Sequence, residues 1–406
     1  MTQPHQPAPS IWSARSSPSP TANHFAAANN DPDSGKSGVT YQVSRQLRDP
    51  IWDALLASAP GSHFEQTSGW GAVKARYGWQ VLRILASADG MLVGGVQALT
   101  KPIGRLGTIG YVARGPTVLP GHEGLDRLLA AQVGRIARNE RWLYGVFNYP
   151  YSAHALAADM IASGYVVHPP GIPPSGLLTA TALLDLRPTE DEILARMRSN
   201  VRRDIRRAQR SGLSFGLGGM EDIPCFRQLM LETCARRDSA PTPPQKDFFH
   251  HLWSELGPQG CVRLFLVRLG DEIVSAAFAF TLSDTIRVWK VGWSGAHGDK
   301  EPNHLMWWEI MRWAKAHGFQ KLDFVWVDTE DAKRAARGEL SPEGFNDGTT
   351  FFKLGFGGVL HFPPPAQSCF FNPLCRLAYR CGGSRLLASN TFQRLLSRYW
   401  SRAAGQ

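Results

Sequence analysis

The stretch CVRLFLVRLGDEIVSAAFAFTLSDTIRVWKVGWSG, residues 261–295, sets the order of elements in its half of the chain. Its apolar runs are rich in Val, Ile, Phe and Trp, the residue types that favour strands, and GDE indicates a tight turn between the first two runs. A helix-like segment, NHLMWWEIMRWAKAHGF (303–319), and a strand-like run, KLDFVWV (321–327), follow. We therefore predict a meander of strands, then a helix, then one further strand.

The first half of the chain repeats this order. Its segments are the strand-like WQVLRILAS (79–87), MLVGGVQALT (91–100) and GTIGYVARGPTV (107–118), the helix-like GLDRLLAAQVGRIARNERW (124–142) and the strand-like LYGVFNY (143–149). In both helix-like segments apolar residues fall on or near one helical face: Leu125, Leu128, Leu129, Val133 and Ile136, and then Leu305, Trp308, Ile310, Met311 and Trp313.

This order of elements, a meander followed by a helix and a strand, is that of GNAT-like N-acyltransferase domains. We therefore expect an α/β (α+β) fold made of two tandem GNAT-like domains, with mixed twisted sheets flanked by helices. Residues 1–40, rich in Pro, Ser, Ala and Asn and without the apolar run of a signal peptide, predict a disordered segment. We expect the first domain at 41–178, the second at 179–362 and a basic amphipathic tail at 363–406.

The bulk charge favours an anionic partner. The 406 residues include 44 Lys and Arg against 34 Asp and Glu, a formal net charge of +10. Such a surplus is typical of proteins that bind nucleic acid, nucleotide diphosphates or anionic lipid. The 6 cysteines include no CxxC pair, so we expect reduced thiols rather than a zinc site or a disulfide framework. No apolar run reaches the roughly 18 residues of a membrane span.

An arginine-rich helix is predicted between the two halves. Thr189 and Glu192 form a capping box, apolar residues follow at spacings of three and four, and Gly212 ends a helix of about twenty residues. Its polar face surrounds the single acid Asp204 with arginines, among them Arg202, Arg203, Arg206 and Arg207. This face is either a solvated charged surface or a phosphate-binding surface for tRNA or a diphosphate.

Five segments resemble, in the same order, the Fem family of peptidoglycan bridge aminoacyltransferases. They are HFEQTSGWGAVKARYGW (63–79), YVARGP (111–116), RSNVRRDIRRAQRSGLSF (198–215), LMLETCARRD (229–238) and FFKLGFGG (351–358). The resemblance covers roughly residues 45–362 and implies two GNAT-like domains in a cytoplasmic protein. It also implies transfer of an amino acid from an aminoacyl-tRNA to the side-chain amine of a stem peptide on UDP-MurNAc-pentapeptide or lipid II, with no metal or redox cofactor.

The resemblance implies that Lys353 is the functional lysine of the family. The flanking glycines allow the backbone to approach a ligand closely, and the lysine can meet a developing oxyanion or the terminal phosphate of a tRNA. The neighbouring Phe352 is expected to contact substrate. A surface lysine before a Gly-rich turn is the alternative interpretation.

Two further positions resemble the family's acceptor site. Lys74, in a helix-like stretch with Trp70, resembles a lysine that meets the acceptor's diphosphate. Arg237 resembles its arginine partner, although the adjacent Arg236 fits the position as well. Ordinary surface cations are the alternative for each.

The chain also departs from the family pattern. Some members carry an Asp where this chain has Asn148, and an amide cannot serve as an anionic base, so the general base is unassigned. Asn148 stays a candidate substrate contact. The segment 329–348 is longer than expected before the FFK motif, which suggests a lid or a specificity loop.

Two other functions remain open. A CoA-dependent N-acyltransferase would share the fold, but its pyrophosphate-binding pattern of Gln or Arg, two residues, Gly, any residue and Gly or Ala is missing from GPTVLPGHEGL and GWSGAHGDKEPNHL. A non-enzymatic protein that binds RNA or anionic membrane would explain the positive charge, but not the repeated domain or the FFKLGFGG segment.

The tail predicts an amphipathic helix. Apolar and aromatic residues recur at helical spacing (Phe392, Leu395, Leu396, Tyr399 and Trp400), while Arg394, Arg398 and Arg402 recur every fourth residue. The helix either packs on the second domain or contacts the anionic inner face of the cytoplasmic membrane. The second alternative predicts a peripheral location and favours the lipid-linked acceptor.

Overall fold

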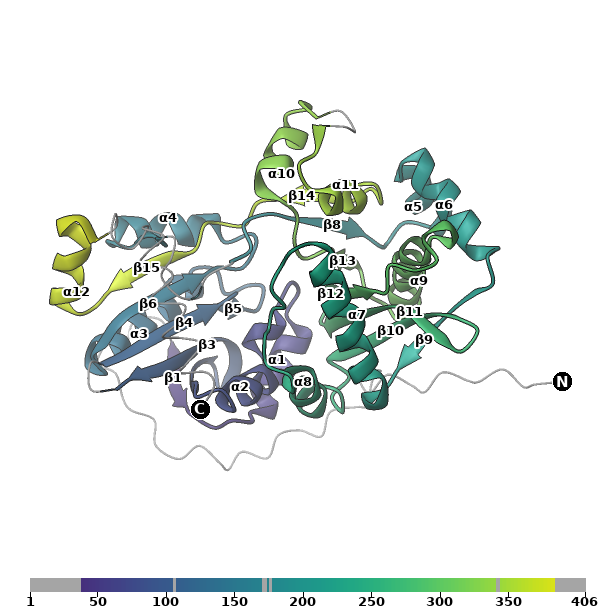
Figure 1. The fold of residues 1–406 in the computed structure, drawn as a ribbon. Coiled ribbons are helices and arrows are strands. Elements are labelled where there is room, and N and C mark those ends of the chain that lie inside the picture. Colours follow the sequence, from purple (N-terminus) through teal and green to yellow (C-terminus); the bar gives the residue numbers. More distant parts are fainter. Residues whose placement is uncertain (1–37, 105–106, 170–173, 175–176, 341–343, 384–406) are drawn as a thin grey trace.

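The computed structural model describes residues 38–104, 107–169, 174, 177–340 and 344–383. Two mixed sheets, each flanked by helices, lie side by side (Figure 1). The segment 1–40, apart from its last residues, and the predicted tail helix around Phe392 lie outside the described residues.

The first sheet has the order β1-β2-β3-β4-β6-β15-β7, with the short β5 on β3. Its strands are β1 Val39–Ser44, β2 Gln80–Ala88, β3 Met91–Ile103, β4 Gly107–Ala113, β5 Thr117–Val118, β6 Trp142–Asn148, β7 Val166–Val167 and β15 Gln367–Phe370. Its helices are α1 Pro50–Ser58, α2 Ser68–Ala75, α3 Leu125–Asn139 and α4 His154–Ala162. The α3 helix buries Leu125, Leu129 and Val133 as predicted, but Leu128 lies at the edge of that face and is 44% exposed.

The second sheet has the order β14-β8-β13-β12-β11-β10-β9. Its strands are β8 Thr181–Asp185, β9 Leu213–Gly218, β10 Val262–Leu269, β11 Glu272–Leu282, β12 Thr285–Trp293, β13 Lys321–Asp323 and β14 Val359–His361. Its helices are α5 Glu190–Arg196, α6 Ser199–Gln209, α7 Ile223–Arg236, α8 Phe248–Leu256, α9 Pro302–Ala316, α10 Thr329–Ala336 and α11 Gly348–Leu354.

The parallel strands β12 and β13 diverge soon after they pair. Their register runs only from Thr285↔Lys321 to Arg287↔Asp323, whereas β12 continues to Trp293. The α7 helix lies against β12, and Gly292 permits this approach because a Cβ there would lie 2.6 Å from the Met230 backbone nitrogen. The divergence opens the second sheet between β12 and the segment after β13.

The arginine-rich segment forms two helices, so the prediction of one continuous helix was wrong. The capping box of Thr189 and Glu192 begins α5 as predicted, but Met197 and Arg198 are extended and separate α5 from α6. Met197 is buried at this break, and the Arg198 amide donates to Gly355 O at 2.9 Å. The Arg198 guanidinium also lies 3.5 Å from the Phe351 ring centre. These contacts with Phe351 and Gly355 therefore replace the helical turn that would otherwise join α5 to α6.

The two sheets share an aromatic core. Phe64 and Trp70 from the first half pack with Phe248, Phe280 and other buried residues of the second half. The Phe64 and Phe280 rings stack with their centres 3.5 Å apart. In Figure 1, α8 of the second half lies beside α2 of the first, in accord with their mutual contacts. Apolar packing of this kind fixes how two domains sit together.

Part of the predicted tail belongs to the first sheet. Residues Gln367–Phe370 form β15, which pairs with β6 and β7. Gln367 is buried there, where it accepts from the Tyr149 hydroxyl at 2.8 Å and donates to Ala157 O at 2.8 Å. A short helix, α12 Pro373–Ala378, follows. Among the described helices, none has the length and apolar character to cross a membrane.

Candidate active site

A cavity of about 510 Å³ opens between α7, β12 and the segment after β13. Aromatic side chains form much of its wall, namely Trp289, Trp293, Trp307, Trp326 and Phe352. Three cations, Arg237, Lys290 and Lys353, also line it. Apolar walls with a few convergent charged groups are typical of ligand sites.

Lys353 reaches this cavity from the last turn of α11. The Asp347 side chain caps that helix by accepting from the Thr350 amide at 2.7 Å. The Lys353 Nζ donates to Phe324 O at 2.8 Å and to Trp326 O at 2.5 Å. Burial lowers the pKa of Lys353 to about 8, although Asp323 and Asp347 oppose this shift. The amine therefore changes its charge near physiological pH.

The structure separates the two arginines that were alternatives in the sequence. Arg237 lines the cavity. The Arg236 guanidinium instead donates to Ser294 O at 2.9 Å and lies 5.1 Å from the Trp293 ring centre. Arg236 thus supports the end of β12 from outside the cavity.

Lys74 and Trp70 lie near the cavity but do not line it. Trp70 is 6% exposed within the shared core, and its ring centre is 6.3 Å from that of Trp289, which does line the cavity. The Lys74 Nζ lies 5.7 Å from the Trp70 ring centre and 5.5 Å from that of Trp79. Burial lowers the pKa of Lys74, and Glu65 opposes the shift.

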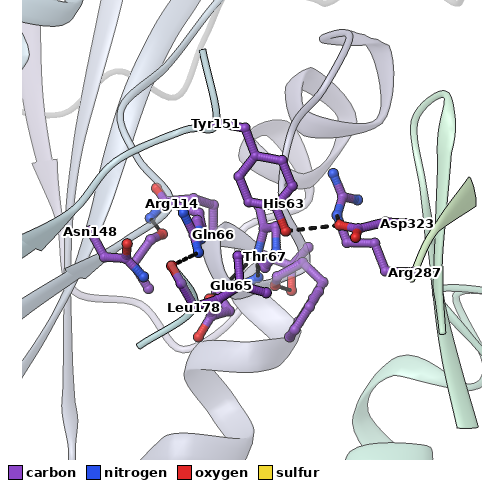
Figure 2. A network of polar contacts seen from close by, with 12 residues as sticks. His63, Glu65, Gln66, Thr67, Arg114, Asn148, Tyr151, Leu178, Arg287 and Asp323 are labelled. Carbon is purple, nitrogen blue, oxygen red and sulfur yellow. Dashed lines mark hydrogen bonds and ion pairs between the residues drawn. The ribbon is translucent and has the colours of Figure 1, made fainter. Parts of the chain in front are cut away.

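Asn148 belongs to a buried polar network between the two halves (Figure 2). It is 3% exposed, and its Nδ2 donates to the Tyr111 hydroxyl at 3.4 Å. Close by, the Arg114 guanidinium donates to Tyr149 O at 3.0 Å and lies 4.7 Å from the Tyr151 ring centre. Asn148 is therefore held beside Tyr111 and does not line the large cavity.

Glu65 is one of two carboxylates in this network that the sequence reasoning missed. Burial raises its pKa, although Arg114, Lys74 and Arg287 oppose the shift. Its Oε2 lies 3.5 Å from His63 Nδ1, but this contact is no ion pair. Burial holds the pKa of His63 well below its ordinary value, and His63 Nδ1 accepts from the Glu65 amide at 3.4 Å. A lone acid in the aromatic HFEQT motif was the available signal.

Asp323 and Arg287 join the same network from the second half. Asp323 is fully buried and accepts from the Tyr151 hydroxyl at 2.8 Å and from Thr181 at 2.6 Å. The Arg287 Nε lies 3.6 Å from Asp323 Oδ2. Figure 2 shows the Tyr151 hydroxyl pointing at Asp323, with Arg287 beside it. In the sequence, the available signal for Asp323 and Arg287 was a charged residue inside an otherwise apolar strand. The same signal marks Lys290 in TIRVWKVGW.

The arginine face of α6 forms a separate shallow hollow of about 450 Å³. Arg203, Arg206, Arg207, Arg210 and Ser211 line it. Asp204 lies 3.0 Å from Arg203 and 3.9 Å from Arg207. Arg202 points elsewhere and donates to Met197 O at the end of α5. Three of the four predicted arginines therefore share one surface, and Arg202 stabilises the helix junction.

Asp204 also lies near Glu301 and His304, close enough for the three to share a metal ion. Arg207 contacts both acids, with its Nη1 3.3 Å from Glu301. Arginines that already neutralise these carboxylates disfavour a cation, and the metal-free expectation stays a prediction.

The long segment at 329–348 borders the large cavity. Within it, the buried Asp331 accepts from the Asn346 and Asp347 amides at 3.1 and 2.8 Å. Gly348 and Thr349, at the start of α11, line the cavity. The segment is thus pinned to the helix that carries Lys353, and its role in specificity stays a prediction.

Comparison with known proteins shows which proteins have a similar architecture. A family model described as an acetyltransferase (GNAT) domain matches residues 195–334. FemX, a solved structure, superposes with a TM-score of 0.69 at 20% identity over 83% of this chain and 99% of FemX. The structure of L-PGS from Bacillus licheniformis superposes with a TM-score of 0.50 at 15% identity over 85% of this chain and 99% of that one.

Curated relatives agree with the structural comparison. The lipid II:glycine glycyltransferase of Staphylococcus saprophyticus subsp. saprophyticus is 26% identical over 240 residues, 56% of either chain. This chain resembles the Fem proteins in sequence and in fold. The enzyme of the same name from Staphylococcus aureus is 26% identical over 232 residues, 54% of this chain and 53% of that one. The Fem-like chain thus spans about half the length of the curated relatives that it matches. Its fold confirms the predicted tandem GNAT-like architecture.

Proposed function

We propose that this Fem-like chain transfers an amino acid from an aminoacyl-tRNA to the side-chain amine of a peptidoglycan stem peptide. The acceptor is carried on UDP-MurNAc-pentapeptide or on lipid II. The observation that carries the proposal is the aromatic cavity with Lys353, Arg237 and Lys290 in its wall. The relatives named lipid II:glycine glycyltransferase support the same class of reaction.

The reaction asks for positioning and charge stabilisation rather than a covalent intermediate. The acceptor amine attacks the ester carbonyl carbon, an amide bond forms, and the ester bond to the tRNA ribose breaks. A protonated lysine has three N–H donors, and Lys353 directs two of its contacts to the Phe324 and Trp326 carbonyls. The third donor is available to the developing oxyanion. We assign this role to Lys353.

The proton that leaves the amine needs an acceptor, and Asn148 cannot be one. We assign this role to Glu65 in the buried polar network, which adjoins the cavity through Asp323 beside Lys353, because its carboxylate lies among Lys74, Arg114 and Arg287. These cations disfavour an ammonium group next to them and so favour the neutral, nucleophilic amine. The raised pKa of Glu65 makes its carboxylate a stronger base than an ordinary glutamate. Glu65 then gives this proton to the ribose oxygen, which leaves as a hydroxyl group, and the carboxylate is regenerated.

The remaining cations suit the two phosphate-bearing substrates. Arg237 and Lys290 in the cavity and the nearby Lys74 fit a diphosphate. The α6 hollow with Arg203, Arg206, Arg207 and Arg210 fits the phosphate backbone of a tRNA.

A transfer assay tests this function. The purified chain is incubated with pools of charged tRNA and with either UDP-MurNAc-pentapeptide or lipid II, and the acceptor is analysed by mass spectrometry. We expect the added mass of one amino acid on one of the two acceptors. Absence of transfer to both from a complete set of charged tRNAs would overturn the proposal.

A CoA-dependent N-acyltransferase is the second candidate, and the match of residues 195–334 to a GNAT domain favours it. The helix that would bind the pyrophosphate is α9. Its N-cap is Glu301, and Pro302 has no N–H to offer. An acid at that position repels a pyrophosphate. Native mass spectrometry that reveals retained acyl-CoA would support this candidate over the first.

A further inference from the structure

A strained turn holds the amine of Lys353. The Trp326 amide donates to Phe324 O at 3.0 Å, which makes a three-residue turn centred on Val325. Val325 has a φ of 67°, in the left-handed region that β-branched residues avoid. The two carbonyls that flank Val325 are those that accept from Lys353 Nζ. Such strain persists only where neighbouring groups fix the backbone.

Asp323 is the group that fixes this turn. Its Oδ1 accepts from the Val325 amide at 2.8 Å and from the Thr181 hydroxyl at 2.6 Å. Its Oδ2 accepts from the Tyr151 hydroxyl at 2.8 Å. Tyr151 follows β6 in the first half of the chain, whereas Asp323, Val325 and Lys353 all belong to the second half.

We propose that Tyr151 is a positioning residue for Lys353. Through its hydrogen bond to Asp323, Tyr151 fixes the carboxylate that holds the Val325 turn, and the turn holds the lysine amine. The first half of the chain thereby completes the active site of the second. This inference rests on the proposed function only for the consequence of the coupling on transfer, not for the coupling itself.

The surroundings of Tyr151 suit a permanent donor. Its ring packs against the Arg114 guanidinium, 4.7 Å from the ring centre, and its ring centre lies 6.3 Å from that of His63. Burial and then the nearby Asp323 raise the pKa of Tyr151 above its ordinary value. The hydroxyl therefore keeps its proton wherever the protein is folded.

The test compares Tyr151→Phe with Tyr149→Phe in the full chain. Both variants lose one buried hydroxyl with a 2.8 Å hydrogen bond, but that of Tyr149 goes to Gln367 within the first sheet. The first readout is the titration midpoint of Lys353. It is obtained from the rate at which a small amine-reactive ester modifies Lys353 at a series of pH values, followed by peptide mass spectrometry. The charged groups that face the amine, Asp323, Asp347, Arg237 and Lys290, are the same in both variants.

We expect Tyr151→Phe to move the midpoint of Lys353 upward from about 8 toward the ordinary value of 10.5, because the amine leaves its buried position. In the transfer assay kcat should fall about tenfold with little change in the acceptor KM, since the loss concerns a hydrogen bond to a charged group. Tyr149→Phe should change neither quantity. Thr181→Val, which removes the other side-chain donor to Asp323, should shift the midpoint in the same direction.

Equal midpoints in Tyr151→Phe and Tyr149→Phe would overturn the proposal, whatever the transfer rate. If Tyr151→Phe does not fold, Thr181→Val tests whether the Asp323 carboxylate holds the Lys353 amine, and an unmoved midpoint in that variant would overturn the proposal. A shifted midpoint with an unchanged transfer rate would uphold the coupling and refute the catalytic role of Lys353. The two failures are thus distinguishable.

Discussion

A buried lysine and a buried glutamate give the proposed reaction opposite requirements for protonation. Lys353 must carry its proton to stabilise an oxyanion, and burial brings its pKa down to about 8. Glu65 must have lost its proton to act as a base, and burial raises its pKa above the ordinary value of 4.5. The transfer rate should therefore rise with pH as Glu65 ionises and fall again as pH passes through about 8.

Replacement of Lys353 by Met tests the alkaline side of this profile. We expect kcat to fall by about a hundredfold or more, with the acceptor KM nearly unchanged, because the cation acts on charge that develops in the transition state. Residual activity should no longer decline near pH 8. Lys333→Met is the control, because Lys333 is exposed on α10 and pairs with Glu330. Normal turnover by Lys353→Met would show that the cavity lysine has no catalytic role.

Replacement of Glu65 by Gln tests the acidic side. The variant keeps the size of the side chain but cannot take up a proton, so we expect a loss of about a hundredfold in kcat and no acidic limb. Glu309→Gln is the matched control, because the Glu309 side chain is also 19% exposed but pairs with Arg312 on the surface of α9. If the acidic limb persists in Glu65→Gln, another group accepts the proton.

The candidate site could be predicted from the sequence only in part. The FFK and ARRD motifs led to Lys353, Phe352 and Arg237, which the structure brings into one cavity. Glu65, Tyr151 and Asp323 could not be grouped beforehand, because they come together only where the two halves of the chain meet. Trp70 gave a misleading signal, since an aromatic residue beside a lysine suits a binding site and a core equally well.

At the scale of elements, the helix period predicted the existence of α5 and α6 but not their separation. The apolar spacing continues through Met197 and Val201 as it would in one helix, and both side chains are buried. The break depends on the distant segment around Gly355, which docks at Arg198. By contrast, the strand repeats predicted the meanders well, because alternation and turn residues are local signals.

The arginine face of α6 should bind tRNA through phosphate contacts. We expect the double replacement Arg203→Gln and Arg206→Gln to weaken tRNA binding and to lower the slope of log K against log salt by about two, one for each lost contact. The double variant Arg187→Gln and Arg337→Gln removes the same charge from exposed arginines that do not line the hollow. Equal slopes for both double variants would mean that the arginine face of α6 is a solvated surface that does not bind tRNA.

Contact between α7 and β12 should be sensitive to a single methyl group. Gly292→Ala places a Cβ 2.6 Å from the Met230 backbone nitrogen, so α7 must move and the cavity wall with it. We expect the free energy of unfolding to fall by about 1–3 kcal/mol, measured by urea denaturation. Gly216→Ala on β9 should be nearly neutral, because its Cβ has no neighbour within 4 Å. A stable Gly292→Ala variant would mean that α7 is loosely packed.

At the scale of the whole molecule, the chain has apolar side chains at its surface within the predicted tail, after β15. Leu374 and Leu377 on α12 are 75% and 59% exposed, and the predicted basic helix follows. We expect the full chain, but not a chain that ends at Asn372, to sediment with anionic vesicles and not with neutral ones. The shorter chain retains β15 and so keeps the first sheet intact. Equal sedimentation of both chains would leave the tail without a membrane role.

The aromatic core shared by the two halves has a consequence for inheritance and engineering. Each half has a core of its own. The repeat suggests an origin by duplication, yet neither copy now buries all of its apolar surface alone, because Phe64 and Trp70 need Phe248 and Phe280 as neighbours. Either half expressed alone would expose these rings to water and aggregate, whereas both halves produced together should reassemble. Recombination between homologous genes would then give a folded protein only when both halves come from the same parent. A duplicated gene of this kind evolves as a single indivisible unit.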